Sequence, residues 1–452
     1  MLSDNMKDHR QRKMHMVNTL NADILKALRR LSSVLWGGPV LVLFLAGGLY
    51  LSIRLSFPQL RLKRIALSTL DTLKNSSSPG GQSPFRAFST SLAAAVGTGS
   101  VAGAGAALAV GGPGALFWMW ISALIGMALS YCENCLAVQF SSEKSAPGGA
   151  YAYISALPKG RTLSKAYALF TVLSSLGMGS MVQSSTGAAA MKNGLGLPGS
   201  AGALIILIFT AAALMGTGSA QRLCEKLLPF TALVFVLGSL LILICSPTAL
   251  IKALGSVFSC AFSPRSAAGG LIGTACIEGL RRGAFSNEAG LGSSPAVHCD
   301  CAQALRDPER SVGIMSMAEI FIDTVVICTL TAMVVLVSGV PLDMDCAQAA
   351  YGAVLGPAGR VFISLSLTLF ALATIAGWSC IGSKAFSYLT GGKESLYSFI
   401  YIICVYAGAL YSPELIWAVS DVFNALMALP NMAALLCFSS RIKKPFSDSA
   451  CQ

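Results

Sequence analysis

Two apolar segments of this chain are interrupted by glycine and polar residues that could bind a solute. The first contains VGTGSVAG at 96–103, broken at 97–100, and the second contains RRGAFSNEAGLGSSP at 281–295, broken around 286–292. A helix that unwinds at such a run leaves carbonyl groups free on one side of the break and N–H groups free on the other. Carbonyl oxygens suit a hard cation and N–H groups attract a carboxylate. The pattern therefore predicts a site for a zwitterionic solute with one or two cations.

Helix packing is the alternative explanation for the glycines. Gly99 and Gly103 form G-x-x-x-G, and small residues at that spacing let membrane helices approach each other closely. Packing does not explain Arg281, Arg282 and Glu288 beside the second run, because charged groups at membrane depth are costly and usually functional. The G-x-G at 97–99 has no βαβ context, which excludes a dinucleotide-binding loop.

The composition places both runs in a helical membrane protein. The chain has 452 residues, of which 54% are hydrophobic and only 12% charged, about half the charged fraction of a soluble protein. The mean hydropathy is +0.67. By the length criterion for a bilayer span, we expect about eleven transmembrane helices, at 33–53, 88–110, 114–140, 163–190, 201–217, 227–246, 268–298, 311–338, 358–379, 396–411 and 413–439.

The two interrupted segments occupy corresponding places in two halves of the chain. Gly97 and Asn287 are 190 positions apart (287 − 97), and five predicted spans begin in each half. Paired, glycine-interrupted spans at matching positions are typical of a transporter binding site. We therefore divide the chain into a polar basic tail (1–32), a transmembrane domain (33–440) and a second tail (441–452). Within the domain we expect an extra helix with its loop (33–87), a first half-repeat (88–246) and a second half-repeat (268–440).

The Lys and Arg residues orient the spans. Loops 54–86, 141–162 and 300–310 and the C-terminus carry most of them, so we expect these parts to be cytoplasmic and the protein to lie in the cell (inner) membrane. The net charge of +12 follows from these loops and does not indicate nucleic-acid binding. The basic N-terminal tail then falls on the outer side, against the usual charge rule. The oligomeric state is left open, and a monomer is compatible with the sequence.

Metal and redox chemistry have weak support. Cys132 and Cys135 form C-E-N-C, and Cys299 and Cys301 form C-D-C, but the chain has only three His residues. Cysteine is also a small apolar residue that fills tight helix packing. We expect no transition metal and no organic cofactor, and we expect His298, near the cytoplasmic end of its segment, to be hydrogen-bonded or solvated and not a ligand.

At these motifs the chain resembles the alanine or glycine:cation symporter family, also called the sodium:alanine symporter family. The likeness runs from GLYLSIRLSFPQLR at 48–61 to NALMALPN at 424–431. Its most specific parts are VGTGSVAG at 96–103, GGPGALFWMW at 111–120, GAFSNEAGLGSSP at 283–295, FIDTVVICTLTAMV at 321–334 and AGWS at 376–379.

The resemblance implies a fold and a function. The fold is the leucine-transporter-like five-plus-five inverted repeat, whose first and sixth core helices are unwound, here with one extra N-terminal helix. The function is alternating-access symport of a small neutral amino acid, alanine or glycine foremost, with Na⁺ or in some members H⁺.

The resemblance also implies residue roles. Substrate contacts fall on both breaks, on the third core helix and on the eighth, at Thr98, Gly99, Ser100, Gln183, Ser185, Phe285, Ser286, Asn287 and Trp378. Sodium contacts fall on carbonyls of the first break and on side-chain oxygens, at Ala95, Val96, Ser100 and Thr374, with Asp323 as a further candidate. The chain departs from the family pattern at Ser100 and Ser185, where Asn is usual, at Ala373, where Thr or Ser is usual, and after AGWS at 380–383. These departures leave the substrate and the number of ions open.

Charged residues near the second break predict a gate. Arg281 and Arg282 fall on the outer side of the break in the expected topology, and Glu278 and Asp323 are the candidate acidic partners. Two other roles are open for Asp323. It could bind an ion or a proton in the transport site, or it could be a purely structural acid.

Other functions compete with sodium-coupled alanine or glycine transport. A proton-coupled or a glutamine- or serine-type transporter would share the same fold. A membrane-embedded enzyme would need a nucleophile with a base or a metal-binding His pair, and neither pattern occurs. A channel would need polar rings along a pore. A fourth alternative is a family member that has lost transport and acts as a sensor or scaffold.

Overall fold

A computed structural model describes residues 23–37, 39–74, 82–144, 148–215, 219–262, 273–343, 345–410 and 413–446, and the described chain is helical with no strand. Residues 23–37 are helical. The other elements of the first half are α2 (Pro39–Val42), the π-helix η1 (Leu43–Gly47), α3 (Gly48–Arg54), η2 (Pro58–Leu60), α4 (Leu62–Lys74), α5 (Pro84–Ala95), α6 (Thr98–Gly111), α7 (Ala115–Lys144), α8 (Ala150–Ile154), α9 (Gly160–Ser174), η3 (Ser175–Val182), α10 (Gln183–Leu195), α11 (Gly199–Leu214), α12 (Ser219–Ile244) and α13 (Pro247–Ala261).

The second half repeats this pattern of long helices with short interruptions. It comprises α14 (Thr274–Asn287), α15 (Pro295–His298), η5 (Cys299–Ala304), α16 (Pro308–Ile320), the π-helix η6 (Phe321–Cys328), α17 (Thr329–Ser338), α18 (Cys346–Thr390), α19 (Glu394–Leu410), α20 (Pro413–Cys437) and η7 (Ser439–Arg441).

Among the residues that the structure describes, seven helices are long and apolar enough to cross a membrane by length and composition, and α11, α13 and α19 are shorter apolar helices. The all-helical membrane architecture is confirmed, whereas the count of eleven spans stays a prediction. Two boundaries differ clearly from those expected. Residues 23–32, which were expected to belong to the polar tail, are helical and continue into the first span, and α18 extends over 346–390 with a kink at Gly356, which has φ 63°. A helix is also present at 247–261, between the two expected half-repeats, where no span was expected.

Both expected helix breaks are present. Helix α5 ends at Ala95 and α6 begins at Thr98, with Gly97 extended between them. Helix α14 ends at Asn287, and Glu288, Gly290 and Gly292 take positive φ before α15 begins. The first break therefore falls one to two residues earlier than the glycine run suggested, and the second falls where it was expected.

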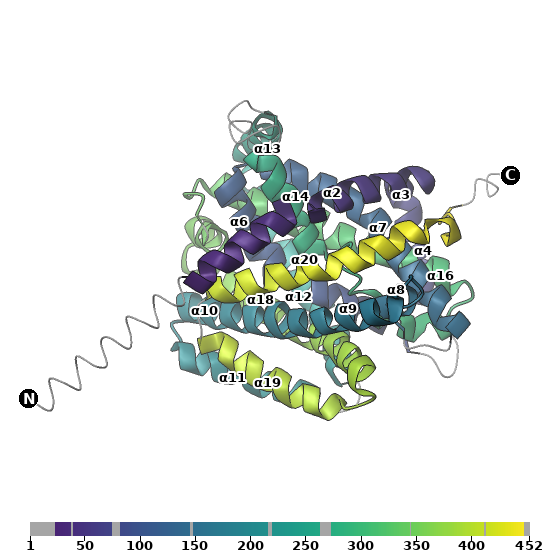
Figure 1. The fold of residues 1–452 in the computed structure, drawn as a ribbon. Helices are drawn as coiled ribbons and strands as arrows, with labels where there is room; N and C mark the ends of the chain where they lie inside the picture. The colour runs from purple at the N-terminus through teal and green to yellow at the C-terminus, as the bar shows by residue number, and fades with distance from the viewer. Residues whose placement is uncertain are drawn as a thin grey trace, which may run out of the picture.

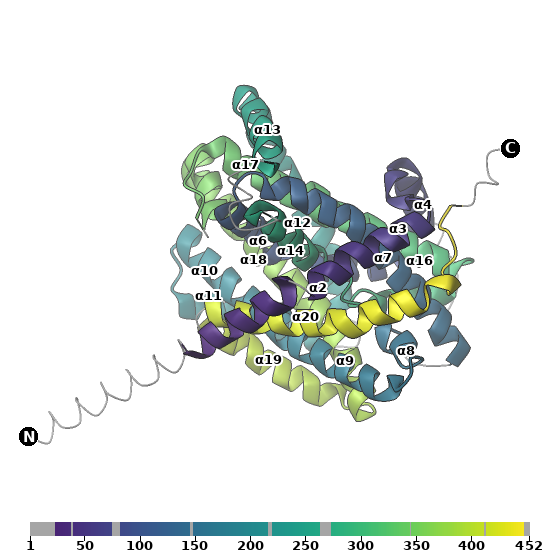
Figure 2. The same cartoon turned by 45° about the horizontal axis from the view of Figure 1, so that its top comes forward.

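The helices around the breaks pack into one bundle. Helix α14 lies against α6 and α7, α10 lies against α18, and α5 lies against α12 and α18. Helices α9 and α20 pack along each other, and the N-terminal helix runs beside α20 in both views (Figure 1, Figure 2). The π-helical turns η3 and η6 interrupt otherwise straight helices, as such turns often do near functional sites. This packing brings residues from both halves to the two breaks.

Candidate substrate and ion site

The first break is held by one amide and one hydroxyl from other helices. Gln183 at the start of α10 accepts through Oε1 from the Thr98 backbone N–H at 3.1 Å and from the Thr98 hydroxyl at 2.8 Å. The Thr374 hydroxyl on α18 reaches the carbonyl of Ala93 at 2.8 Å and that of Val96 at 3.4 Å. A Cβ placed on Gly97 would lie 2.6 Å from Thr374 Oγ1. Close backbone approach, which only glycine allows here, therefore joins α10 and α18 to the break.

Asp323 connects the two breaks. Ser100 from α6 donates a hydrogen bond to Asp323 Oδ1, Ser286 from α14 donates to Oδ2 at 2.7 Å, and Thr324 also donates to Oδ2, at 2.8 Å. Asp323 and Ser100 have no exposed surface, and Ser286 is 2% exposed. In the described part of the chain no arginine or lysine pairs with this carboxylate, so the expectation that Asp323 partners Arg281 or Arg282 is wrong. The hydroxyls of both broken helices converge on Asp323 instead.

The Asp323 carboxylate and the three hydroxyl groups that contact it form an oxygen-rich set that fits a hard monovalent cation. An ionised carboxylate buried without a cation is strongly disfavoured unless hydrogen bonds or a bound ion compensate it. Ser100 also lies 3.3 Å from the Ala95 carbonyl. The predicted ion residues therefore form two adjacent groups, one around Asp323 and one around Thr374 and the Val96 carbonyl.

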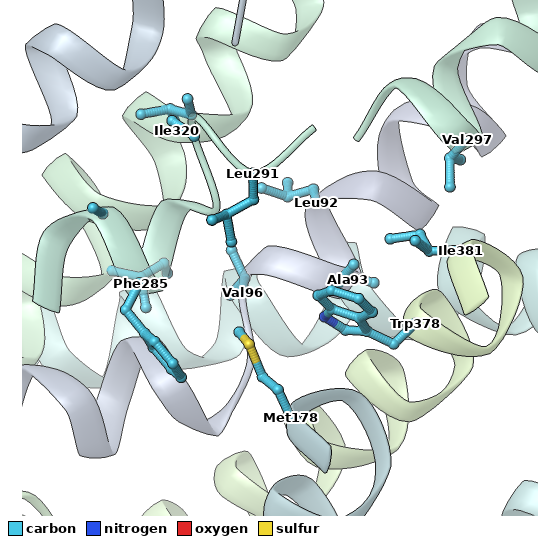
Figure 3. Packing of buried hydrophobic residues seen from close by; sticks show 14 of the residues in the cluster. Leu92, Ala93, Val96, Met178, Phe285, Leu291, Val297, Ile320, Trp378 and Ile381 are labelled. Carbon is cyan, nitrogen blue, oxygen red and sulfur yellow. The ribbon is translucent and has the colours of Figure 1, made fainter. Parts of the chain in front are cut away.

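The remaining predicted substrate residues lie on different sides of the breaks. The Phe285 ring stacks in a tilted arrangement on Trp417, with ring centroids 5.2 Å apart. The Trp378 indole donates to Glu288 Oε1 at 2.9 Å. In the view of Figure 3, Val96 lies between Phe285 and Trp378. Ser185 is buried on α10, and no hydrogen bond of the described residues joins it to the other predicted site residues.

The packing alternative for Gly99 and Gly103 receives little support. A Cβ on Gly99 would come no closer than 3.9 Å to another residue, at Phe285, and a Cβ on Gly103 would meet nothing within 4 Å. Neither glycine is therefore required for a close helix contact. Gly283 is different, because a Cβ there would lie 2.6 Å from Ser122 Cβ on α7.

The second break is capped by buried acids. Glu133 on α7 accepts from the Gly292 N–H at 3.1 Å and from the Asn431 amide at 2.6 Å. Glu288 accepts from the Ser293 hydroxyl at 2.7 Å in addition to Trp378. Asn287 folds its Oδ1 onto the Ala289 N–H at 3.1 Å, and its Nδ2 is buried without a partner. Side chains thus accept hydrogen bonds from some of the backbone N–H groups that unwinding leaves free, and the side-chain amide of Asn287 keeps one donor without a partner.

A cavity of about 630 Å³, here called the vestibule, lies on one side of both breaks. Its wall includes residues 101–103 after the first break and Arg281 and Arg282 before the second. Arg281 pairs with Asp421 on α20 at 2.7 Å and with Glu278 at 3.4 Å. Arg282 lies 3.8 Å from Glu278 and 5.7 Å from the Trp417 ring centre. Both arginines therefore have the expected partner Glu278, and Arg281 has a second, unexpected partner in Asp421.

Sequence reasoning missed Asp421 and Trp417 as members of this site. Both stand in IWAVSDVFNAL at 416–426, where an acid and a tryptophan interrupt an apolar segment. Asp421 is near the end of its expected span, a position that favours a structural role. The structure shows that α20 closes the vestibule wall, which gives both residues a place beside the break.

Among the described residues, no group of three or more His, Cys, Asp and Glu side chains is arranged to hold a metal ion. Cys132 and Cys135 are buried free thiols in helix packing. His298 is hydrogen-bonded on both ring nitrogens, to Asn134 and Glu319, as expected for a satisfied core histidine.

Comparison with known proteins agrees with this geometry. The family model described as the sodium:alanine symporter family matches residues 21–450. The sodium/alanine symporter AgcS of Methanococcus maripaludis is 36% identical over 434 residues, covering 92% of this chain and 95% of the relative. The probable sodium/glutamine symporter GlnT of Bacillus subtilis is 33% identical over 436 residues, covering 92% and 89%.

A solved structure supports the fold. The manganese transporter of Eremococcus coleocola aligns with a TM-score of 0.52 at 16% identity, over 82% of this chain and 81% of that one. At this identity the likeness concerns the fold alone, which is the leucine-transporter-like arrangement. With its two helix breaks and its close relatives, the chain belongs to the sodium:alanine symporter family, whose members are transporters and not enzymes.

Proposed function

We propose that this protein carries a small neutral amino acid, alanine or glycine foremost, together with Na⁺ across the cell membrane by alternating access. Membership of a symporter family supports cation-coupled amino-acid transport in general. The observation that carries the finer proposal is the Asp323 carboxylate, which hydroxyls of both broken helices contact. A cation bound there would attach the first half-repeat to the second.

The substrate carboxylate is placed at the start of α6. Thr98, Gly99 and Ser100 follow the extended Gly97 at the positive end of the helix dipole. The Thr98 N–H already donates to Gln183 and the Ser100 N–H to the Gly97 carbonyl, so the Gly99 N–H is the donor proposed for the carboxylate. Gln183 fixes Thr98, and Phe285, Ser286 and Asn287 would face the amino group and side chain from α14. Phe285 and Trp378 are large and almost fully buried, which favours a small substrate side chain.

The coupling ions are placed on two neighbouring oxygen groups. Asp323, Ser100 and Ser286 supply one, and Thr374 with the Ala95 and Val96 carbonyls supplies the other. Na⁺ prefers such hard oxygen ligands, and ligand positions on α5, α6, α14, η6 and α18 would make ion binding depend on how these helices are arranged. Ion binding and substrate binding would in this way favour the same conformation.

The vestibule is the proposed access path from outside. Arg281, Arg282 and Trp417 line it next to Phe285, so they would form the outer gate. Loops 54–86, 141–162 and 300–310 and the C-terminus are proposed to be cytoplasmic, because they carry most of the Lys and Arg residues.

The test is uptake of radiolabelled alanine into proteoliposomes with and without an inward Na⁺ gradient, followed by competition with a panel of neutral amino acids. We expect Na⁺-dependent uptake that glycine and alanine compete for best. Preferred competition by glutamine would instead assign the substrate class of the relative described as a probable sodium/glutamine symporter. Absence of gradient-driven uptake for every neutral amino acid would leave the sensor or scaffold interpretation.

A further inference from the structure

On the opposite side of the breaks from the vestibule, a second and much smaller cavity lies between two acids. Its volume is about 10 Å³, and Glu288 from the second break and Glu319 from α16 both line it, together with Ser91 and Asn287. A cavity of this size holds about one water molecule. Its lining residues Ala95 and Asn287 also belong to the proposed ion and substrate sites, whereas Glu288 and Glu319 have no role there.

The Glu319 side of this cavity contains a hydrogen bond with one exchangeable proton. Asn134 Nδ2 donates to the Ser130 carbonyl at 2.9 Å, so its Oδ1 faces His298 Nδ1 at 3.1 Å and Nδ1 must carry a proton. His298 Nε2 lies 2.7 Å from Glu319 Oε1. One proton therefore lies between Nε2 and the carboxyl group, and it can belong to the imidazolium or to the carboxylic acid. The other Glu319 oxygen accepts from Ser91 at 2.8 Å.

The Glu288 side has hydrogen-bond donors but no cation. Glu288 accepts from Ser293 and from Trp378, and it is 6% exposed. In the described chain neither Glu288 nor Glu319 has a lysine or arginine partner. The two carboxyl groups therefore share one small cavity with no side-chain cation between them.

Asn287 indicates what the cavity holds. It is 5% exposed, it lines the cavity, and its Nδ2 has no hydrogen-bond partner. An amide N–H needs an acceptor such as a water oxygen, whereas it would repel Na⁺. A water at this point could accept from Asn287 and donate toward the carboxyl groups.

Other ionisable groups around the cavity do not neutralise the two acids. Glu133 on α7 and Asp323 on η6 are further buried acids near Glu288 and bring no positive charge. Lys384 on α18 is engaged by Asp300 and the Ala296 carbonyl. Helix α4 also packs against α16, but its basic residues Lys63 and Arg64 are exposed.

We propose that the cavity between Glu288 and Glu319 is a proton-binding site, in which a bound water links the two carboxyl groups and His298 extends the path away from the breaks. In the transfer, the Glu288 O–H bond breaks as its proton passes to the water, and the water gives one of its own protons to Glu319. The negative charge moves from Glu319 to Glu288, and the water is regenerated. This inference rests on the proposed function, to which it adds a carried proton.

The first test measures the proton without transport. Infrared spectra of the purified protein during a pH titration show the C=O band of protonated carboxyl groups, and we compare wild type with Glu288→Gln, Glu319→Gln and the exposed control Glu394→Gln. Gln preserves the size of Glu, and either variant that folds is sufficient. We expect one titrating component to be lost in the cavity variants and retained in the control. If the cavity variants keep the complete wild-type band, the proposal is overturned.

The second test measures proton movement with alanine. Proteoliposomes that contain a pH-sensitive dye are given a Na⁺ gradient, and acidification of the lumen is recorded together with alanine uptake. We expect wild type and Glu394→Gln to acidify the lumen as alanine enters, and Glu288→Gln to lose this acidification. Uptake without acidification in wild type would overturn the carried proton and leave the proposed symport intact. If wild type shows no uptake at all, the proposed function fails, and the infrared result still decides whether the cavity binds a proton.

Discussion

Arg281 on α14 and Asp421 on α20 form a 2.7 Å ion pair in the vestibule wall, next to the second break. The N-terminal helix is attached to the same acid, because the Trp36 indole donates to the Asp421 carbonyl at 2.9 Å and the Ser32 hydroxyl approaches the carboxylate at 3.4 Å. Asp421 is 6% exposed. A helix outside the inverted repeat therefore contacts the proposed outer gate through one residue.

Removal of only one member of this pair should be more harmful than removal of both. Arg281→Gln leaves the buried Asp421 carboxylate with Ser32 alone, and we expect a loss of about 3 kcal/mol in the free energy of unfolding together with weak uptake. Arg281→Gln with Asp421→Asn removes both charges and should restore part of the loss. Unfolding in detergent and alanine uptake measure the two effects.

The exposed pair of Arg29 and Glu414 provides the control, because its side chains are 61% and 68% exposed. Arg29→Gln should cost less than about 1 kcal/mol. A double variant as defective as the worse single variant would show that Arg281 and Asp421 do not act as a pair.

Two glycines of the first broken helix should respond oppositely to alanine. In Gly97→Ala the new Cβ would lie 2.6 Å from Thr374 Oγ1 and 3.1 Å from Gln183 Oε1, so both side chains that hold the break must move. We expect loss of uptake. Gly103→Ala meets nothing within 4 Å, and in a helix it should stabilise the protein by about 0.4–1 kcal/mol. Uptake and thermal unfolding distinguish the two variants. Equal loss of activity in both would favour a packing role for the whole glycine run.

Asp323 should determine the dependence on Na⁺. Asp323→Asn retains hydrogen-bonding capacity but removes the charge, and a charge-assisted contact is worth about 1.5–3 kcal/mol, or about 10- to 100-fold in affinity. We expect the Na⁺ concentration for half-maximal uptake to rise by about that factor. Thr231→Val, which removes a buried hydroxyl that donates to the Leu227 carbonyl within α12 at 2.8 Å, is the control. An unchanged Na⁺ dependence in Asp323→Asn would remove this residue from the ion site.

The backbone features of the site were predictable from the sequence because glycine and polar residues are conspicuous in apolar helices. The runs near Gly97 and Gly290 located both breaks to within about two residues. Asp323 was noticed for the same reason, as a lone acid within FIDTVVIC. Its partners Ser100 and Ser286 are short hydroxyl side chains, and only the convergence of three helices gives them a common acceptor.

Contacts between segments that are far apart in the chain could not be predicted from a single sequence. Arg281 and Asp421 are 140 positions apart, and Ser91 and Glu319 are 228 apart. Periodicity indicates which face of a helix is apolar but not which helix covers it, so Glu278 and Asp323 were named as gate partners because they are near in sequence. The helix at 247–261 was missed because it is only 15 residues long and contains Lys252.

Two exposed cysteines should report the orientation of the helices. Cys245 follows α12 and Cys437 ends α20, and both are free and exposed. In the proposed topology Cys245 lies outside and Cys437 lies in the cytoplasm. A membrane-impermeant maleimide should label Cys245 on intact cells and reach Cys437 only after permeabilisation, with Cys245→Ser and Cys437→Ser identifying each signal. Labelling of Cys437 on intact cells would reverse the proposed orientation.

Trp378 should limit the size of the transported side chain. The side chain is completely buried, and its indole donates a hydrogen bond to Glu288. It packs closely on η3, because a Cβ added to Gly179 would lie 2.4 Å from the Cβ of Trp378. Trp378→Ala opens space beside the first break and should let larger neutral amino acids compete with radiolabelled alanine. The truncation should also cost about 3–5 kcal/mol in stability, so purified protein must be checked for folding first.

Trp378→Phe separates size from hydrogen bonding. It keeps most of the ring but removes the donor to Glu288, so we expect the substrate preference to stay narrow while uptake falls. If both variants compete like wild type, Trp378 lies outside the substrate pocket. If Phe broadens the preference as much as Ala, the hydrogen bond that orients Glu288 controls selectivity and the size of the ring does not.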